Sequence, residues 1–99
     1  MVIAVFRSSL RPDCEKEFQQ LGTRMLDLAQ SMPGFISYKV YVSDDGERCS
    51  VIEFDSADNL AAWRDHPEHL AAQQAGRERY YEEYSLIVAD ARRSSSFSR

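Results

Sequence analysis

The stretch FISYKVYVSDDGERCSVIEFD, residues 35–55, decides the fold of this chain. Apolar and polar side chains alternate on both sides of Asp44-Asp45-Gly46, with the period of two that is typical of β-strands. Glycine readily adopts the left-handed backbone conformation that a short hairpin loop needs. We therefore predict a β-hairpin with strands at 35–43 and 47–55, in which the numbers of paired residues sum to about 90.

The two faces of this hairpin differ in polarity. The apolar face, which we expect to meet the helices, carries Ile36, Tyr38, Val40, Ser50, Ile52 and Phe54. The opposite face is mixed and carries Phe35, Ser37, Lys39, Tyr41, Cys49, Val51, Glu53 and Asp55. The mixed face is too apolar to lie free in water and too polar for a monomer core. We therefore expect it to form a subunit interface.

One strand and one helix are predicted before the hairpin. Residues 2–8 are rich in β-branched and apolar side chains, which indicates a strand. Pro12 suits the first position of a helix, whose apolar side chains then recur at three- and four-residue steps. Met32-Pro33-Gly34 ends this helix.

A broken helix and a last strand are predicted after the hairpin. Ser56 caps a helix over about residues 57–64, and Pro67 restarts it as far as about residue 79. Residues 80–89 then indicate a strand. The serine-rich stretch 92–99 has little to bury, so we expect one domain at 1–91 and a flexible tail at 92–99.

The resulting order, βαββαβ, predicts an α+β ferredoxin-like fold. In this plan both helices cover the same face of a four-stranded antiparallel sheet. The other face then needs a cover of its own. A homodimer formed sheet to sheet, burying on the order of 1,000 Å² or more, is the simplest solution.

Composition excludes several classes of function. The 99-residue chain has a net charge of −4 and no basic stripe, so we expect no nucleic-acid partner. Its two cysteines, Cys14 and Cys49, are too few for a disulfide framework and favour free thiols in a reducing compartment. The apolar run at 2–6 is too short for a signal peptide or membrane span. We therefore expect a cytoplasmic protein without a membrane partner.

The segment 59–69 concentrates the residues best suited to chemistry. It contains the only tryptophan, Trp63, together with both histidines, His66 and His69. Asn59 and Trp63 are one helical turn apart and lie on the same helix face. The helix break at Pro67 is expected to turn amide, indole and imidazole groups toward one pocket.

These residues also carry a family resemblance. The motif Met32-Pro33-Gly34-Phe35, and Trp63, His66-Pro67 and His69 with Ala71, Ala72 and Tyr80 beyond them, resemble the antibiotic biosynthesis monooxygenase superfamily. The resemblance spans about residues 2–90 and implies a dimeric α/β barrel that binds a small molecule. Some members oxidise electron-rich aromatic or enolic compounds with O₂ and no cofactor; others degrade haem, act on small aldehydes or signal molecules, or have no known role.

The resemblance assigns roles residue by residue. Asn59 and Trp63 match the Asn and Trp that hold the substrate in the superfamily's polyketide-quinone monooxygenases. His69 lies six residues after that Trp, where those enzymes have a tyrosine. A histidine is available as a base at neutral pH, so the prediction is that His69 moves the proton.

Haem degradation is disfavoured by the same comparison. The haem-degrading branch has an Asn in its first strand, where this chain has Arg7 and Ser8. Its iron-binding His follows the Trp by ten residues, where this chain has Gln73. No metal is predicted either, because His66 and His69 have only Asp65 and Glu68 nearby as further ligands.

The predicted site therefore has His69, Trp63 and Asn59 as catalytic residues, and Tyr38, His66 and Tyr84 as substrate contacts. Each has a plainer alternative. His69 is an ordinary helical histidine, His66 only a helix cap, and Asn59 a partner of local backbone groups. Trp63, Tyr38 and Tyr84 are core residues in that view.

The predicted function is a cofactor-independent monooxygenase that acts on a small aromatic or enolic substrate. Two alternatives stay open: a non-catalytic dimer that binds a small ligand or serves in a stress response, and a haem-binding or haem-degrading protein.

Overall fold

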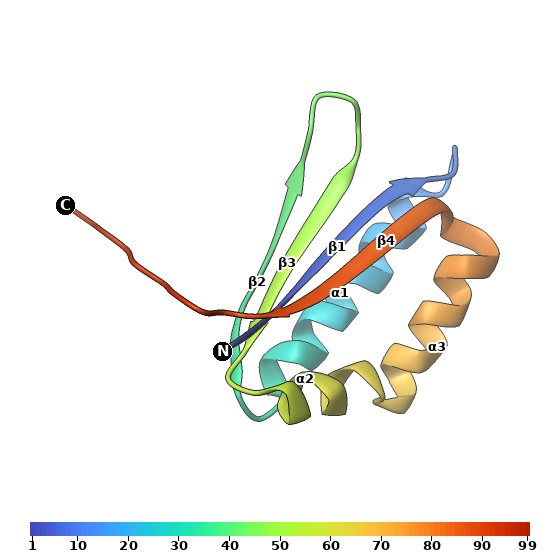
Figure 1. Cartoon of the computed structure of the whole chain (residues 1–99). Coiled ribbons are helices and arrows are strands. Elements are labelled where there is room, and N and C mark those ends of the chain that lie inside the picture. The colour runs from blue at the N-terminus through green and yellow to red at the C-terminus, as the bar shows by residue number, and fades with distance from the viewer.

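The computed structural model describes residues 1–99 and confirms the ferredoxin-like order, with one short helical segment added. Four antiparallel strands form a sheet in the order β2-β3-β1-β4, and the helices cover one of its faces (Figure 1). The elements are β1 (Val2–Leu10), α1 (Glu15–Ser31), β2 (Phe35–Val42), β3 (Arg48–Phe54), α2 (Ala57–Arg64), α3 (Pro67–Ala75), η1 (Gly76–Tyr80) and β4 (Tyr81–Asp90).

The hairpin has the predicted register along most of its length. Tyr38 pairs with Ile52 and Val40 with Ser50, so the numbers of paired residues sum to 90. Gly46 has φ of 90°, the left-handed conformation predicted for the loop. This register places Tyr38, Ser50 and Ile52 on the face that meets the helices.

The prediction is wrong at the start of β2, where the register shifts between Phe35 and Ser37. Phe35 pairs with Phe54, and their rings pack edge to face with centroids 5.8 Å apart. Ile36 is left 48% exposed instead of facing the helices. An extra residue in one strand exchanges the faces of the residues before it, which strict alternation does not foresee.

The first helix begins later than predicted. Pro12 lies in a turn, Asp13 has a positive φ of 67°, and α1 starts at Glu15 after Cys14. Aspartate tolerates the left-handed conformation better than most residues, so the chain can turn sharply before the helix. The predicted apolar stripe does face the core, with Met25 and Ala29 buried.

The helix break has the predicted form. The Ser56 hydroxyl accepts a hydrogen bond from the Asn59 backbone N–H at 3.2 Å and caps α2. His66 Nδ1 accepts one from the Glu68 backbone N–H at 3.1 Å and caps α3, which has Pro67 in its first turn. The α-helix ends at Ala75, and the π-helical turn η1 leads into β4. This turn takes the place of the predicted last helical residues.

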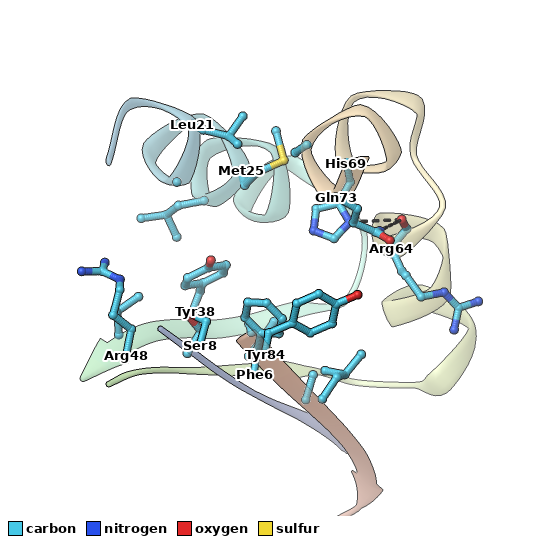
Figure 2. Close-up of a pocket in the computed structure, with 18 of the residues that line it drawn as sticks. Phe6, Ser8, Leu21, Met25, Tyr38, Arg48, Arg64, His69, Gln73 and Tyr84 are labelled. Atoms are coloured by element: carbon cyan, nitrogen blue, oxygen red, sulfur yellow. Dashed lines mark hydrogen bonds between the residues drawn. The ribbon is translucent and has the colours of Figure 1, made fainter. Parts of the chain in front are cut away.

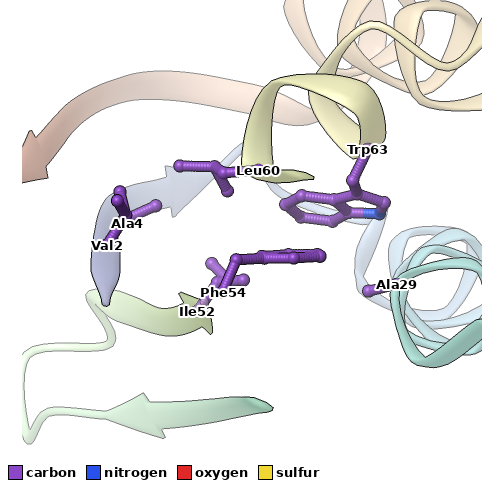
Figure 3. Packing of buried hydrophobic residues seen from close by; sticks show 7 residues of the cluster. All are labelled: Val2, Ala4, Ala29, Ile52, Phe54, Leu60 and Trp63. Atoms are coloured by element: carbon purple, nitrogen blue, oxygen red, sulfur yellow. The ribbon is translucent and has the colours of Figure 1, made fainter. Parts of the chain in front are cut away.

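The hydrophobic core occupies one half of the layer between sheet and helices. We call this the packed half; it consists of Val2, Ala4, Ala29, Ile52, Phe54, Leu60 and Trp63 (Figure 3). Phe54 is fully buried, and the Trp63 indole stacks over its ring with centroids 5.9 Å apart. Leu60 and Trp63 therefore pack α2 against the ends of β1 and β3.

No helix covers the outer face of the sheet, where Ile87 is 63% exposed. The contact of this face with a second copy of the chain stays a prediction. None of the helices has both the length and the apolar character needed to cross a membrane. Residues 92–99 contain no helix or strand, and Figure 1 shows them leading away from the domain.

Candidate functional site

A cavity of about 600 Å³ occupies the other half of the layer, which we call the hollow half. Its floor is the inner face of the sheet, and its roof is formed by α1 and α3 (Figure 2). Side chains on both sides are predominantly apolar; those labelled in Figure 2 include Phe6, Tyr38, Tyr84, Leu21 and Met25. The volume and the apolar walls are typical of sites for small organic molecules.

His69 lies at one end of this cavity, in the first turns of α3. Its Nδ1 is 3.1 Å from the backbone oxygen of Arg64 and 2.8 Å from Nε2 of Gln73 (Figure 2). The Arg64 oxygen lies at the end of α2, where carbonyl groups lack partners within the helix, and it also accepts a hydrogen bond from Nε2 of Gln73 at 3.0 Å. The helix break thus supplies the contact that orients the imidazole.

The two tautomers of His69 use different partners. With the proton on Nδ1, the ring donates to the Arg64 oxygen and Nε2 is left as a proton acceptor. With the proton on Nε2, Nδ1 accepts from the Gln73 amide. Nε2 lies on the cavity side of the ring in Figure 2. The site can therefore present either a base or an acid to a bound molecule.

Burial is the main reason why the pKa of His69 is lowered from its ordinary value of 6.5. A desolvated imidazole resists carrying a charge, so the ring is neutral at neutral pH. The Trp63 indole covers it, with ring centroids 4.2 Å apart. Trp63 borders both halves of the layer, and its buried Nε1 has no hydrogen-bond partner. In Figure 3 this nitrogen lies on the side of Ala29.

Tyrosine hydroxyl groups supply further polar atoms to the walls. Tyr38 and Tyr84 line the cavity as predicted, together with Tyr81. Burial raises the pKa of Tyr38 and of Tyr81, so both phenols stay protonated and available as donors. The rings of Phe6, Tyr81 and Tyr84 cluster with centroids 5.3–5.5 Å apart.

The sequence pattern does not predict that Tyr81 lines the cavity. The inner-face residues of β4 have even numbers, and simple alternation would place Tyr81 outside. The register of β4 against β1 shifts between Ser9 and Leu10, next to Tyr81. The ring also packs against Gly76, where a Cβ atom would collide with it. The glycine five residues before Tyr81 is the one signal in the sequence for this packing.

Asn59 and His66 are not among the residues that line the cavity. The Asn59 amide donates to the Asp55 carboxylate at 2.7 Å, and both side chains pack against Gly34. Gly34 has φ of 79° and no room for a Cβ atom. The structure therefore brings together four of the six predicted residues, Trp63, His69, Tyr38 and Tyr84. Asn59 ties α2 to the turn before β2, and His66 caps α3.

Every charged residue in the cavity lining is basic: Lys39, Arg48, Arg64 and Arg77. Arg64 forms an ion pair with Asp65 at 2.9 Å. Arg48 is half-buried, and its guanidinium lies 5.3 Å from the centre of the Phe18 ring without an ion-pair partner. The net charge of the sequence does not predict this arrangement, because it averages over the whole surface.

No three or more His, Cys, Asp or Glu side chains gather closely enough to hold a metal ion. The polar groups of the cavity are instead one neutral imidazole, phenols and aliphatic hydroxyls, amides, one ammonium and guanidinium groups. Such a set can accept a proton from a bound molecule and can donate hydrogen bonds to an anion.

Comparison with known proteins identifies the family. The model of the antibiotic biosynthesis monooxygenase family matches residues 1–75. The uncharacterized protein YqjZ of Bacillus subtilis (strain 168) is 35% identical over 94 residues, which are 95% of this chain and 82% of that protein.

Two solved structures have the same fold. Rv0793 of Mycobacterium tuberculosis has a TM-score of 0.85 at 24% identity, with 96% of this chain and 98% of that chain covered. A point mutant of SnoaB, a cofactor-independent oxygenase of Streptomyces nogalater, has a TM-score of 0.80 at 18% identity, with 94% of each chain covered. These two structures show the shared fold, and the family model, which matches three quarters of the chain, shows that the chain belongs to the antibiotic biosynthesis monooxygenase family.

Proposed function

We propose that this protein is a cofactor-independent monooxygenase that oxidises a small aromatic or enolic compound with O₂ in the hollow half. The observation that carries the proposal is a neutral His69 whose Nε2 faces an apolar cavity of about 600 Å³. Family membership and the fold shared with SnoaB, described as a cofactor-independent oxygenase, support it further.

The reaction requires the substrate to supply the electrons. His69 removes a proton from an activated CH₂ or OH group, and the resulting anion reduces O₂. For an activated CH₂ group, one oxygen atom forms a carbonyl, the other leaves as water with both hydrogens, and the carbon loses four electrons. A positioned general base contributes about 10²–10⁴-fold to such a step.

The remaining residues hold the imidazole and the substrate. Trp63 stacks on His69, while Tyr38 and Tyr84 contact the bound ring system from the sheet. Asn59 and His66 act from outside the cavity as positioning residues: Asn59 anchors α2, and the His66 cap fixes the first turn of α3 beside His69.

Oxygen consumption with anthrone-like and hydroquinone-like substrates tests the proposal. We expect turnover by the native protein, a loss of about 10²-fold or more in His69→Gln, and a smaller loss in Trp63→Phe. His66→Asn, which keeps a helix-capping side chain, is the matched control and retains turnover within about tenfold. Unchanged turnover in His69→Gln would contradict the role of the imidazole. Binding of these compounds without oxygen uptake would favour a non-catalytic binding protein. A Soret shift on mixing with hemin would favour a haem-binding protein.

We also propose that the protein is a cytoplasmic homodimer joined through the outer face of the sheet. Exposed Ile36, Tyr41 and Ile87 give this face an apolar surface that one chain leaves uncovered. Light scattering across a dilution series tests the dimer. Ile87→Lys is expected to weaken association at least tenfold, because a lysine ammonium loses water on burial. Leu70→Lys, at an exposed apolar residue of α3, is the control and leaves association unchanged. A native protein that is monomeric at all concentrations contradicts the dimer.

A further inference from the structure

The formal charges around the cavity are all positive. The chain as a whole has a net charge of −4, yet the cavity lining contains four basic residues and no carboxylate. His69 and Arg48 are both half-buried. His69 lies at one end of the cavity and Arg48 at the other (Figure 2). The two ends therefore differ in chemistry: one holds a neutral imidazole, the other a permanent cation.

Arg48 is held in place from several sides. Its guanidinium packs on the Phe18 ring of α1 at 5.3 Å from the ring centre. Across the sheet, Arg48 of β3 pairs with Ser8 of β1, which in turn pairs with Tyr84 of β4. This row brings one guanidinium and two hydroxyl side chains to the same strip of the cavity floor.

The positive charge of Arg48 also affects the phenols of Tyr38 and Tyr81. Burial raises the pKa of Tyr38 and of Tyr81, and the positive charge of Arg48, which lines the same cavity, acts in the opposite direction. In Figure 2 Arg48 lies at the end of the cavity away from His69, and Tyr38, whose ring packs edge to face on Trp63 with centroids 6.0 Å apart, lies between them. No carboxylate of the chain forms an ion pair with Arg48.

We infer that Arg48 binds the carboxylate of an aromatic acid, whose ring system then extends along the cavity toward His69. A guanidinium presents two parallel N–H donors that match the two oxygens of a carboxylate. Tyr38 lines the cavity with a protonated phenol, and the rings of Phe6, Phe18 and Tyr84 line the space for the aromatic part. Arg48 is the one half-buried cation among the four basic residues of the lining, and one guanidinium suits a single negative charge better than the double charge of a phosphate.

This substrate class rests on the proposed oxidation but is tested by binding alone. The probes are 2-naphthoate and its neutral analogue 2-naphthamide, measured by isothermal titration calorimetry at neutral pH. We expect 2-naphthoate to bind about tenfold to a hundredfold more tightly, as charge-assisted hydrogen bonds allow. Added NaCl should weaken the binding of the naphthoate and not that of the amide.

Three variants locate the effect. Arg48→Gln should abolish the preference for the acid while retaining the binding of the amide, and Arg48→Lys should keep part of it, because lysine retains the charge without the planar fork. Arg77→Gln removes the same charge from an exposed lining residue and should keep the preference within about twofold.

Three outcomes overturn the inference: equal affinity for the two probes, a preference that survives in Arg48→Gln, or no binding of either probe by the native protein. Tight, Arg48-dependent binding of the acid in a protein that consumes no oxygen would support the inference and contradict the proposed oxidation. Oxidation of neutral substrates without preference for the acid would support the proposed oxidation and contradict the role of Arg48.

Discussion

The packed half and the hollow half lie on the same face of one sheet, yet one is filled and the other is empty. In the packed half, Leu60 and Trp63 of α2 descend onto the ends of β1 and β3. The helix breaks after the end of α2 at Arg64, and α3 begins at Pro67. It runs in a different direction and forms part of the cavity roof (Figure 1). The cavity lies beyond this break, where the lining side chains His69 and Gln73 come from α3 and leave the space over the sheet open.

The choice of side chains in the hollow half maintains the opening. Gly22 of α1 and Ala72 of α3 line the cavity without filling it. Ser8 and Ser50 occupy inner-face positions of the sheet, where the packed half has Ile52 and Phe54. Stability and binding are therefore assigned to two halves of one layer that share a boundary formed by Ala4, Ile52, Leu60 and Trp63.

Truncating one aromatic residue in each half tests this division most directly. Phe54→Ala is expected to lower the free energy of unfolding by about 3–5 kcal/mol, because it leaves a void in a fully buried cluster. Tyr84→Ala should cost about 1 kcal/mol or less, since Tyr84 is 44% exposed and already borders open space. Urea unfolding followed by circular dichroism measures both. Equal losses would show that the two halves are packed alike.

A smaller effect is expected where the packed half is anchored to the turn before β2. Asn59→Ala removes its 2.7 Å hydrogen bond to Asp55 and should lower the free energy of unfolding by about 1 kcal/mol. Asp55→Ala should cost a similar amount, and the double variant less than the sum, because both substitutions remove the same bond. The same urea titration gives the three values.

The Asn59 variant also separates two interpretations of this residue. A positioning role outside the cavity predicts that turnover falls by less than about tenfold. The role implied by the family resemblance, direct contact with the substrate, predicts a loss of about 10²-fold or more. Asp55→Ala breaks the same hydrogen bond but keeps the amide of Asn59, and it is the matched control: a positioning role predicts the same small loss of turnover, whereas direct substrate contact predicts that turnover is retained.

The regular parts of the fold were predictable because local rules determine them. The alternation and the Gly46 loop predicted the hairpin register, and Ser56 and Pro67 predicted where α2 and α3 begin. These features depend on side chains close in sequence, which act through capping, backbone conformation and the pleat of the strand. The order of elements then followed from their number and spacing.

The failures occurred where one residue depends on a distant partner. The bulge at Ile36 and the shift beside Tyr81 arise from pairing between strands, which periodicity within one strand does not report. Asn59 was assigned to the pocket because it shares a helix face with Trp63, yet its amide turns to Asp55. The role of Arg48 was not predictable, because it depends on the absence of a carboxylate beside it in the folded chain.

The smallest expected effect concerns the hollow half alone, through the titration of His69. Burial lowers the pKa of this imidazole below 6.5, so the unfolded chain binds the proton more tightly than the folded chain. Acid therefore favours unfolding from about pH 6.5 down to the lower pKa of the folded state, while above about 6.5 the ring is neutral in both states. His69→Gln removes this share of the pH dependence and keeps a side chain that can donate to the Arg64 oxygen. Urea unfolding of both proteins at pH 7.5 and 5.5 should therefore show a smaller acid loss in the variant. Equal acid losses would mean that the imidazole is hydrated as fully as in the unfolded chain, and the hollow half would then have no desolvated base to offer a substrate.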